Sequence, residues 1–302
     1  MLCLETSNLS HRFASQEVLR GIGLQVPEGS IYGFLGPNGA GKTTTLRLLL
    51  GLLATQRGEI SIFGKRFAEN RLAILRKVGS MIESPSLYDH LTAAENLRVL
   101  QLVHRCPRRR IAEVLELVGL GDTGSKRARH FSLGMRQRLG IAAALLHRPS
   151  LIILDEPTNG LDPSGIIDIR NLLIELIRRE GCTILVSSHL LPEVDRVATH
   201  VGILGRGRLL FQGSIDELRR HRQEVVSIHI STGDNAAALE TTTGNGIDAR
   251  LVDGAIVLPP LSPERVAALN RQWVAGGIEV YEISFVRNDL ETIFLDLVRD
   301  AE

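Results

Sequence analysis

The chain has 302 residues and a net charge of +1, and 44% of its residues are hydrophobic, 23% charged and 4% aromatic. The length predicts about two domains, while the near-neutral charge and the scarce aromatic residues argue against nucleic acid as a partner. The three cysteines lie far apart without C-x-x-C spacing, so neither a zinc site nor a disulfide framework is indicated. We expect no signal peptide and no membrane-spanning segment, so any action at a membrane would require a partner chain.

Short strands are expected at residues 2–6, 22–26 and 31–35, and the third leads into a glycine-rich loop. The loop fits the pattern G-x-x-x-x-G-K-[ST] at every fixed position, and residues 44–50 follow it as a helix. Strand, loop and helix in this order are the context that a phosphate-binding loop requires. A glycine-rich turn before an ordinary helix is the alternative, and the register of all fixed residues disfavours it.

The chemistry of this loop, Gly36-Pro37-Asn38-Gly39-Ala40-Gly41-Lys42-Thr43, follows from its residue types. Its glycines let successive N–H groups face one anion, and the start of the following helix adds a partial positive charge. Lys42 offers an ammonium to the β- and γ-phosphates of a nucleotide, and the hydroxyl of Thr43 can ligate Mg²⁺.

The next segment reads as a strand at 58–64, a short helix near 69–75, and a strand at 77–82 that runs into Glu83. From about 92 to 148 the pattern is helical. Thr92 and Glu95 predict a capping box, and we expect Leu97, Leu100 and Val103 on the apolar face of that helix. A second helix should follow Pro107, with Ile111, Val114, Leu115 and Val118 on one face. The basic run at 108–110 is expected to be a solvated helix start.

The apolar run at 151–154 predicts a central strand of a parallel sheet, and it ends in Asp155-Glu156. A helix near 163–180 and a strand at 183–186 follow, and the latter runs into His189. Alternating strands and helices predict a mostly parallel sheet that is covered on both faces. Because ligands collect at the carboxyl ends of such strands, Gly36, Asp155 and His189 should gather at one edge.

The composition shifts near residue 220, where 219–223 looks like a linker. We therefore expect domains at 1–220 and 221–302, with a helical subdomain at about 84–148. The second domain should contain a strand at 225–230, a helical piece at 236–239, a hairpin turn at Asp253-Gly254, an amphipathic segment at 262–276, a strand at 278–284 and a helix at 289–300. This pattern predicts a small α+β domain of ferredoxin-like character, and it contains no constellation of catalytic residues.

The stretch Phe131-Ser132-Leu133-Gly134-Met135-Arg136-Gln137-Arg138-Leu139 precedes Asp155-Glu156. Together with the phosphate loop, it resembles the signature region of ABC-type ATPases, and the resemblance covers residues 2 to about 215. The residues around both motifs are most similar to those of the branch that exports bacitracin and lantibiotics. The resemblance implies an α/β fold, the P-loop ABC nucleotide-binding domain, in which a mixed sheet with a mostly parallel core carries a helical subdomain. The C-terminal α+β domain resembles the accessory segment of that branch.

The resemblance also implies roles for single residues. Phe13 would stack on the adenine of ATP, and the phosphates would be held by the loop, with residues Gly36, Pro37, Asn38, Gly39, Ala40, Gly41, Lys42, Thr43 and Thr44. Asp155 would hold Mg²⁺ together with Thr43, Glu156 would be the general base, and His189 would contact the γ-phosphate and the attacking water. A core phenylalanine is the alternative for Phe13, and a structural histidine for His189.

Further implied roles involve partners. Ser132, Leu133, Gly134 and Met135 would bind the γ-phosphate of ATP held by a second copy, so the active unit would be a head-to-tail dimer. Asp162 would lie in a loop that couples the two active sites. Glu83 stands where the family usually has a metal-contacting glutamine that faces the permease, and an exposed loop acid is the alternative. Leu133 and Met135 depart from the common glycine and glutamine, but they leave Ser132 and Gly134 in place.

The resemblance thus implies an ATP-hydrolysing subunit that works at the cytoplasmic face of the membrane through a separate permease. The expected cargo is an antimicrobial peptide such as a lantibiotic or bacitracin, which would give resistance or immunity. Export of another hydrophobic drug, a lipid or a polysaccharide by an ABC-2-type system is the first alternative. A soluble ABC ATPase of translation or DNA repair is disfavoured by the single cassette without sustained heptads. A GTPase switch is disfavoured because no Asn/Thr-Lys-x-Asp stretch occurs.

Overall fold

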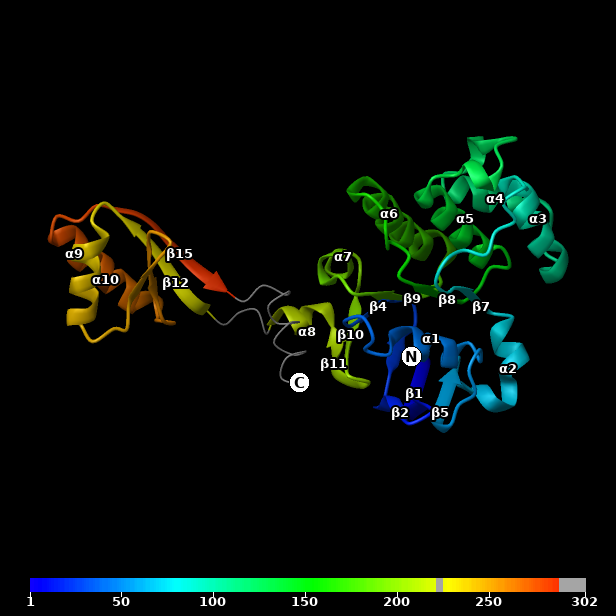
Figure 1. Cartoon of the computed structure of the whole chain (residues 1–302), viewed down its shortest axis with the longest axis horizontal. Coiled ribbons are helices and arrows are strands. Elements are labelled where there is room, and N and C mark those ends of the chain that lie inside the picture. Colours follow the sequence, from blue (N-terminus) through cyan, green and yellow to red (C-terminus); the bar gives the residue numbers. More distant parts are fainter. Residues whose placement is uncertain (221–224, 288–302) are drawn as a thin grey trace. The chain divides into compact units, whose positions relative to one another are not determined.

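The computed structural model describes residues 1–220 and 225–287, and its contacts divide the chain into two compact units, with the division after Ile215 (Figure 1). Most of the expected linker and the expected helix at 289–300 lie outside the described residues. Within the two described ranges, none of the helices combines the length and the apolar character that crossing a bilayer demands.

A six-stranded sheet forms the centre of the first unit, in the order β11-β10-β4-β9-β8-β7. Its strands are β4 (Ile31–Leu35), β7 (Val78–Met81), β8 (Leu151–Asp155), β9 (Thr183–Ser188), β10 (His200–Gly205) and β11 (Arg208–Ser214). Each neighbouring pair from β10 to β7 is parallel, and only the edge strand β11 runs antiparallel to its neighbour. Every residue of β4, β8 and β9 is buried, as expected for strands covered on both faces. The predicted mostly parallel core is therefore confirmed.

A second sheet contains β1 (Leu2–Phe13), β2 (Gln16–Ile22), β3 (Gln25–Pro27), β5 (Arg57–Ile62) and β6 (Lys65–Arg66). The expected strand at 22–26 is wrong, because the chain leaves the sheet between β2 and β3, and β1 is longer than the expected strand at 2–6. The hydroxyl of Thr6 explains the break: it donates to the carbonyl of Ile22 at 2.9 Å and accepts from the N–H of Leu24 at 2.8 Å. A side chain thus replaces ladder bonds at this point.

Helices cover both faces of the central sheet, with α5 and α6 on one face and α1 on the other (Figure 1). The helices of the first unit are α1 (Lys42–Leu49), α2 (Phe67–Leu75), α3 (Ala93–His104), α4 (Arg109–Leu117), α5 (Leu133–Leu145), α6 (Pro163–Glu180) and α7 (Leu191–Asp195), and α8 (Ile215–Arg220) begins at the division between the two units. The capping box at Thr92 is confirmed. The predicted inner face of α3 is wrong at Val103, which is 72% exposed. The expected residues 97, 100 and 103 are three apart, and such a row turns around the helix because one turn takes about 3.6 residues. The buried face of α3 instead includes Ala93, Leu97 and Gln101, which are four residues apart.

Arg110 contradicts the expectation that the basic run 108–110 is solvated. Its side chain is buried, and its guanidinium bonds both carboxylate oxygens of Glu180, at 3.1 and 2.9 Å. It also donates to the carbonyl of Leu145 at 3.3 Å. The reason is helical phase: Arg110 lies on the face of α4 that meets α5 and α6, whereas Arg108 and Arg109 are exposed.

Two glycines let α5 lie very close to β7 and so fix how near the helix approaches the sheet. A Cβ at Gly79 would lie 2.1 Å from the carbonyl oxygen of Ala144, and one at Gly140 would lie 2.6 Å from the sulfur of Met81. Because real Cβ atoms do not approach so closely, no larger residue fits this contact without a shift of the helix.

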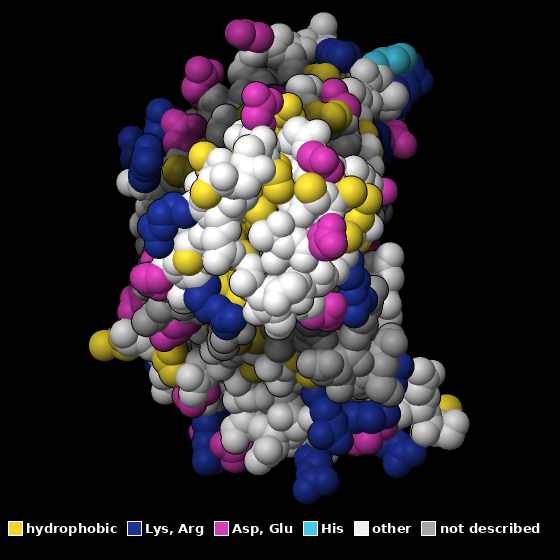
Figure 2. All heavy atoms as spheres, turned by 90° about the vertical axis from the view of Figure 1, so that its left-hand side faces the viewer, with side chains coloured by type: hydrophobic (Ala, Val, Ile, Leu, Met, Phe, Trp, Pro, Cys, Tyr) yellow, Lys and Arg dark blue, Asp and Glu magenta, His cyan; other side chains and the backbone are white. Residues whose placement is uncertain are grey.

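The second unit has the strand order β13-β14-β12-β15, with every neighbouring pair antiparallel. Its elements are β12 (Val225–Thr232), α9 (Asn235–Gly244), β13 (Arg250–Val252), β14 (Ala255–Leu258), α10 (Pro263–Ala275) and β15 (Val280–Arg287), a βαββαβ succession with the ferredoxin-like order. Asp253 and Gly254 both have positive φ, at 48° and 79°, as the predicted hairpin turn requires. Trp273 is fully buried and donates from its indole nitrogen to the carbonyl of Ala238 at 3.2 Å. On the face of this unit that Figure 2 shows, charged side chains lie around a largely uncharged centre.

Candidate nucleotide site

The phosphate loop connects β4 to α1 and is held by close contacts on two sides. A Cβ at Gly36 would lie 2.4 Å from the carbonyl oxygen of Leu204, and one at Gly41 would lie 2.6 Å from the side chain of Leu19. Gly39 and Gly41 also have φ of 81° and 109°, which side chains rarely allow. The loop therefore needs glycine at position 36 for its place against β10 and at position 39 for its conformation. At position 41 it needs glycine for both its conformation and its place against β2.

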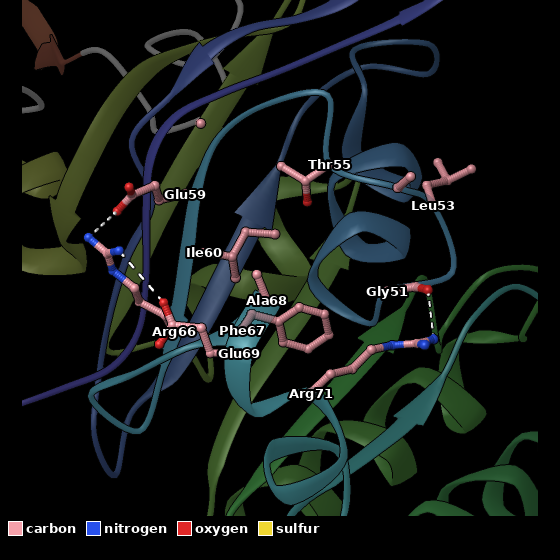
Figure 3. Close-up of a pocket in the computed structure, with 12 residues that line it drawn as sticks. Gly51, Leu53, Thr55, Glu59, Ile60, Arg66, Phe67, Ala68, Glu69 and Arg71 are labelled. Carbon is pink, nitrogen blue, oxygen red and sulfur yellow. Dashed lines mark hydrogen bonds and ion pairs between the residues drawn. The ribbon is translucent and has the colours of Figure 1, made fainter.

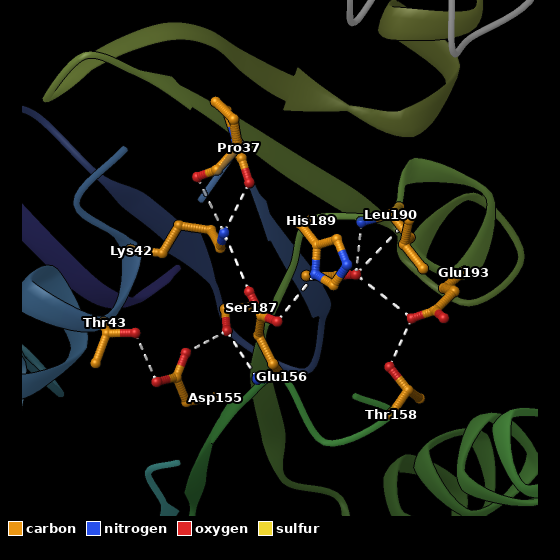
Figure 4. Close-up of polar contacts among 12 residues, drawn as sticks. Pro37, Lys42, Thr43, Asp155, Glu156, Thr158, Ser187, His189, Leu190 and Glu193 are labelled. Atoms are coloured by element: carbon orange, nitrogen blue, oxygen red, sulfur yellow. Dashed lines mark hydrogen bonds and ion pairs between the residues drawn. The ribbon is translucent and has the colours of Figure 1, made fainter. Parts of the chain in front are cut away.

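Lys42 is buried at the start of α1, and its ammonium points back into the loop (Figure 4). Its Nζ donates to the carbonyl of Gly36 at 2.7 Å and to that of Pro37 at 3.3 Å, and it lies 3.1 Å from Oε1 of Glu156. A buried cation beside main-chain N–H groups at a helix start is suited to an anion such as a phosphate.

Asp155 and Thr43 come together across the edge of the sheet, as the sequence predicts. The hydroxyl of Thr43 donates to Oδ2 of Asp155 at 2.8 Å, and the hydroxyl of Ser187 donates to Oδ1 at 2.6 Å. The Ser187 oxygen in turn accepts the main-chain N–H of Glu156 at 2.9 Å. Sequence reasoning missed Ser187, although the alignment of the ends of two adjacent parallel strands, which pair Asp155 with Ser187, could have indicated it.

Glu156 and His189 form the centre of this group (Figure 4). Oε2 of Glu156 lies 2.9 Å from Nδ1 of His189, and their side chains are 20% and 32% exposed. The backbone of Glu156 has φ of 44°, the left-handed region that non-glycine residues seldom adopt. A partly buried carboxylate between an ammonium and an imidazole can accept a proton from a water molecule.

The donor set around Thr43 and Asp155 fits Mg²⁺ bound together with a nucleotide. Mg²⁺ prefers oxygen ligands and usually takes one or two protein groups, with water and phosphate completing its shell. In the part of the chain that the structure describes, no three His, Cys, Asp or Glu side chains are placed to hold a metal ion by themselves. One hydroxyl and one carboxylate are the partial shell that phosphates would complete.

The signature residues at the start of α5 lie beside residues 160–162, where the loop that follows Glu156 ends. Ser132 caps α5 and accepts the N–H of Met135 at 3.3 Å, and Leu133 and Gly134 begin the helix. They line a hollow of about 410 Å³ together with the start of α6. Asp162 caps α6, where bonds from the Ser164 hydroxyl at 2.8 Å and the Gly165 N–H at 3.1 Å hold its pKa below the usual value. The structure thus brings Ser132, Leu133 and Gly134 together with Asp162 in a hollow that neither Met135 nor the phosphate loop lines.

Phe13 and Glu83 contact neither the residues around Lys42 and Glu156 nor the signature residues around Ser132. Phe13 ends β1 at a hairpin turn and is 45% exposed, with its ring edge-on to His11 at 4.6 Å, so it is not a core residue. Glu83 has φ of 60° and is 62% exposed, and its carboxylate pairs with Arg47, one turn after Thr43 on α1. Its contact with a metal stays a prediction.

Another hollow, of about 560 Å³, lies beside the far end of α1 (Figure 3). Its charged residues engage one another: Arg66 lies between Glu59 and Glu69 at 3.6 and 3.7 Å, and Arg71 donates to the carbonyl of Gly51 at 3.0 Å. None of the predicted site residues lines it, so its size alone does not make it the candidate site.

Comparisons with known proteins show which family the chain resembles in sequence and fold. A family model described as ABC transporter matches residues 19–159. Bacitracin transport ATP-binding protein BcrA of Bacillus licheniformis is 40% identical over 98% of this chain and 97% of its own length. Lantibiotic transport ATP-binding protein SrtF of Streptococcus pyogenes is 40% identical over 70% of this chain and 91% of its own. A solved structure described as the ATP binding subunit of an ABC transporter superposes with a TM-score of 0.65 and 35% identity, over 73% of this chain and 92% of that one.

Proposed function

Since the chain belongs to the ABC transporter family, as an ATP-binding ATPase subunit, we propose that it powers the export of an antimicrobial peptide through a separate permease. It would act at the cytoplasmic face of the membrane. The observation that carries the catalytic part is the convergence of Lys42, Glu156 and His189 at one sheet edge. The full-length similarity to a bacitracin transport protein supports the class of cargo.

In this proposal the chain's own groups position ATP and a water molecule. Lys42 and the N–H groups of the loop hold the β- and γ-phosphates, while Thr43 and Asp155 hold Mg²⁺. When bound, Mg²⁺ neutralises charge on the phosphates. Glu156 takes a proton from the water as its oxygen bonds the γ-phosphorus, the bond from that phosphorus to the β–γ bridging oxygen breaks, and ADP leaves. His189, at hydrogen-bond distance from Glu156, orients the carboxylate and the water.

The free space around Gly134 supports a head-to-tail dimer. A Cβ at Gly134 would meet nothing closer than the side chain of Leu161 at 3.7 Å, an ordinary contact. The fold of one chain therefore does not require glycine there, whereas the phosphates of ATP bound to a second copy would need that space. Ser132, exposed at the start of α5, would bond the same phosphates.

We expect Glu156→Gln to retain ATP binding and to lower hydrolysis about 10²–10⁴-fold, because a general base contributes that much. Lys42→Ala should abolish ATP binding at working concentrations. ATP affinity by calorimetry and phosphate release by the full chain measure the two effects. Near-normal turnover of Glu156→Gln, or unchanged affinity of Lys42→Ala, would refute the respective assignment.

The cargo is tested by expressing the chain with candidate permeases in a sensitive bacterium. Survival on bacitracin or a lantibiotic should rise with the wild-type chain and not with Glu156→Gln. Equal protection by both chains would show that hydrolysis at this site does not drive the export.

A further inference from the structure

A hydrogen bond between Thr158 and Glu193 joins the two segments that carry Glu156 and His189. Thr158 follows Glu156 after β8, and Glu193 lies in α7, which follows His189 after β9. The hydroxyl of Thr158 donates to Oε2 of Glu193 at 2.6 Å (Figure 4). The same oxygen lies 3.4 Å from the hydroxyl of Ser188. The segment after β8 and the segment after β9 are thus joined twice, once between Glu156 and His189 and again two residues later by Thr158 and Glu193.

Glu156 needs such support because its backbone is strained. A non-glycine residue at φ of 44° keeps this conformation only when its surroundings hold it. On one side, the N–H of Glu156 is bound by Ser187 at 2.9 Å. On the other side, the N–H of Asn159 donates to the carbonyl of Glu156 at 3.1 Å, and Thr158 is tied to Glu193.

Packing alone does not hold this region. A hollow of about 90 Å³ is lined by Glu156, Thr158, His189 and Glu193 together with their neighbours, so each of these side chains borders open space. A directional bond has to supply the restraint that close packing supplies elsewhere in the sheet.

We propose that the Thr158–Glu193 bond is a clamp that positions Glu156 against His189 for ATP hydrolysis. The proposal rests on the proposed function of Glu156. Thr158 and Glu193 are positioning residues, since each acts through its neighbour. Without the clamp, the segment after Glu156 separates from α7 and Glu156 relaxes towards an ordinary φ. Hydrolysis then slows, while ATP binding persists because it depends on Lys42 and the phosphate loop.

The test compares four single variants and one double variant of the full chain: Thr158→Val, Thr158→Ser, Glu193→Ala, Thr123→Val and Thr158→Val with Glu193→Ala. Thr158→Val and Glu193→Ala should each lower kcat about 10-fold or more, as a misplaced catalytic group does, with KM for ATP unchanged. Thr158→Ser keeps the hydroxyl, and its kcat should therefore stay close to that of wild type. The double variant should be no slower than Glu193→Ala alone, because Glu193→Ala already removes the bond that Thr158→Val removes. Thr123→Val is the matched control, since it removes a hydroxyl that bonds the carbonyl of Leu120 at 2.8 Å, away from this site.

A second measurement does not depend on hydrolysis. Amide hydrogen exchange at Asn159 should be faster in Thr158→Val than in wild type, and unchanged in Thr123→Val. Unchanged exchange, an unchanged kcat, or a Thr158→Ser variant as slow as Thr158→Val would overturn the clamp. If wild type fails to hydrolyse ATP, the proposed function fails, and the exchange measurement still decides on the clamp.

Discussion

At the scale of a single side chain, Glu83 forms an ion pair with Arg47 of α1, the helix that follows the phosphate loop. Both side chains are well exposed, at 62% and 39%, and such a pair contributes only about 0–1 kcal/mol. We therefore expect Glu83→Gln to keep its fold and its basal ATP hydrolysis, while protection of cells through the permease changes. Phosphate release measures basal hydrolysis, and survival of cells on the drug measures protection. If the ion pair matters, Arg47→Gln should change protection in the same way as Glu83→Gln. Complete loss of basal hydrolysis in Glu83→Gln would contradict this.

The sequence predicted those site residues whose types and spacing form a motif. Asp155, Glu156 and His189 lie at or just past strand ends, Lys42 and Thr43 begin α1, and the structure brings their side chains together. Their catalytic roles stay predictions. Ser187, Thr158 and Glu193 were missed because a serine, a threonine or a glutamate in a loop is common and carries no signal alone. Their importance depends on which atoms they meet across two strands, and only the fold reveals this.

At the scale of elements, an ion pair between buried Arg110 and Glu180, whose side chain is 19% exposed, joins α4 to α6. Removing one member of a buried ion pair leaves the other charge without compensation, which costs about 3–5 kcal/mol. We expect Arg110→Met to lower the free energy of unfolding by about that amount, as measured by urea unfolding followed by circular dichroism. Arg109→Met is the matched control, since its side chain is 80% exposed, and it should change stability by less than about 0.5 kcal/mol. Equal effects of the two substitutions would show that the pair is not structural.

The ends of α3 and α5 meet through two stacked histidine rings. His104 and His147 have ring centroids 4.3 Å apart and ring planes within 6°, and Nε2 of His147 lies 3.1 Å from the carbonyl oxygen of Val78. Burial lowers the pKa of His104; burial first, and then the nearby His104, lower the pKa of His147. Because the unfolded chain then binds protons more readily, this contribution to stability is present above pH 6.5 and is lost as the pH falls below that value.

We therefore expect the free energy of unfolding to fall between about pH 7.5 and 5.5, and to fall less in His104→Phe, which keeps a ring but cannot be protonated. Urea unfolding at several pH values measures both slopes. Parallel pH profiles for wild type and His104→Phe would show that the stacked rings do not contribute.

The elements themselves were largely predictable, because hydrophobic period and caps are local signals. The capping box at Thr92 and the helix at 163–180 coincide with the structure, and so does the hairpin turn at Asp253. The errors at 22–26 and at Arg110 depend on contacts between residues distant in sequence, with the hydroxyl of Thr6 and with Glu180. The error at Val103 is one of helical phase.

On the scale of the whole molecule, the single tryptophan reports on one unit only. Trp273 is buried in the core of the second unit, among residues such as Ile230 and Ile256. Its fluorescence therefore follows the second unit, while phosphate release follows the first. The ferredoxin-like order of this unit follows from its succession of strands and helices.

The proposed dimer gives the last prediction, which depends on space that one chain leaves open. With ATP and Mg²⁺, Glu156→Gln should run as a dimer in size exclusion with light scattering. Adding Gly134→Asp should return it to a monomer with unchanged ATP affinity, because the chain itself has room for the side chain and a carboxylate repels the partner's phosphates. Gly244→Asp is the control, since a Cβ there meets nothing within 4 Å in the second unit, and it should leave the dimer intact. A Glu156→Gln chain that stays monomeric with ATP, both alone and with its permease, would exclude two copies sharing the nucleotide.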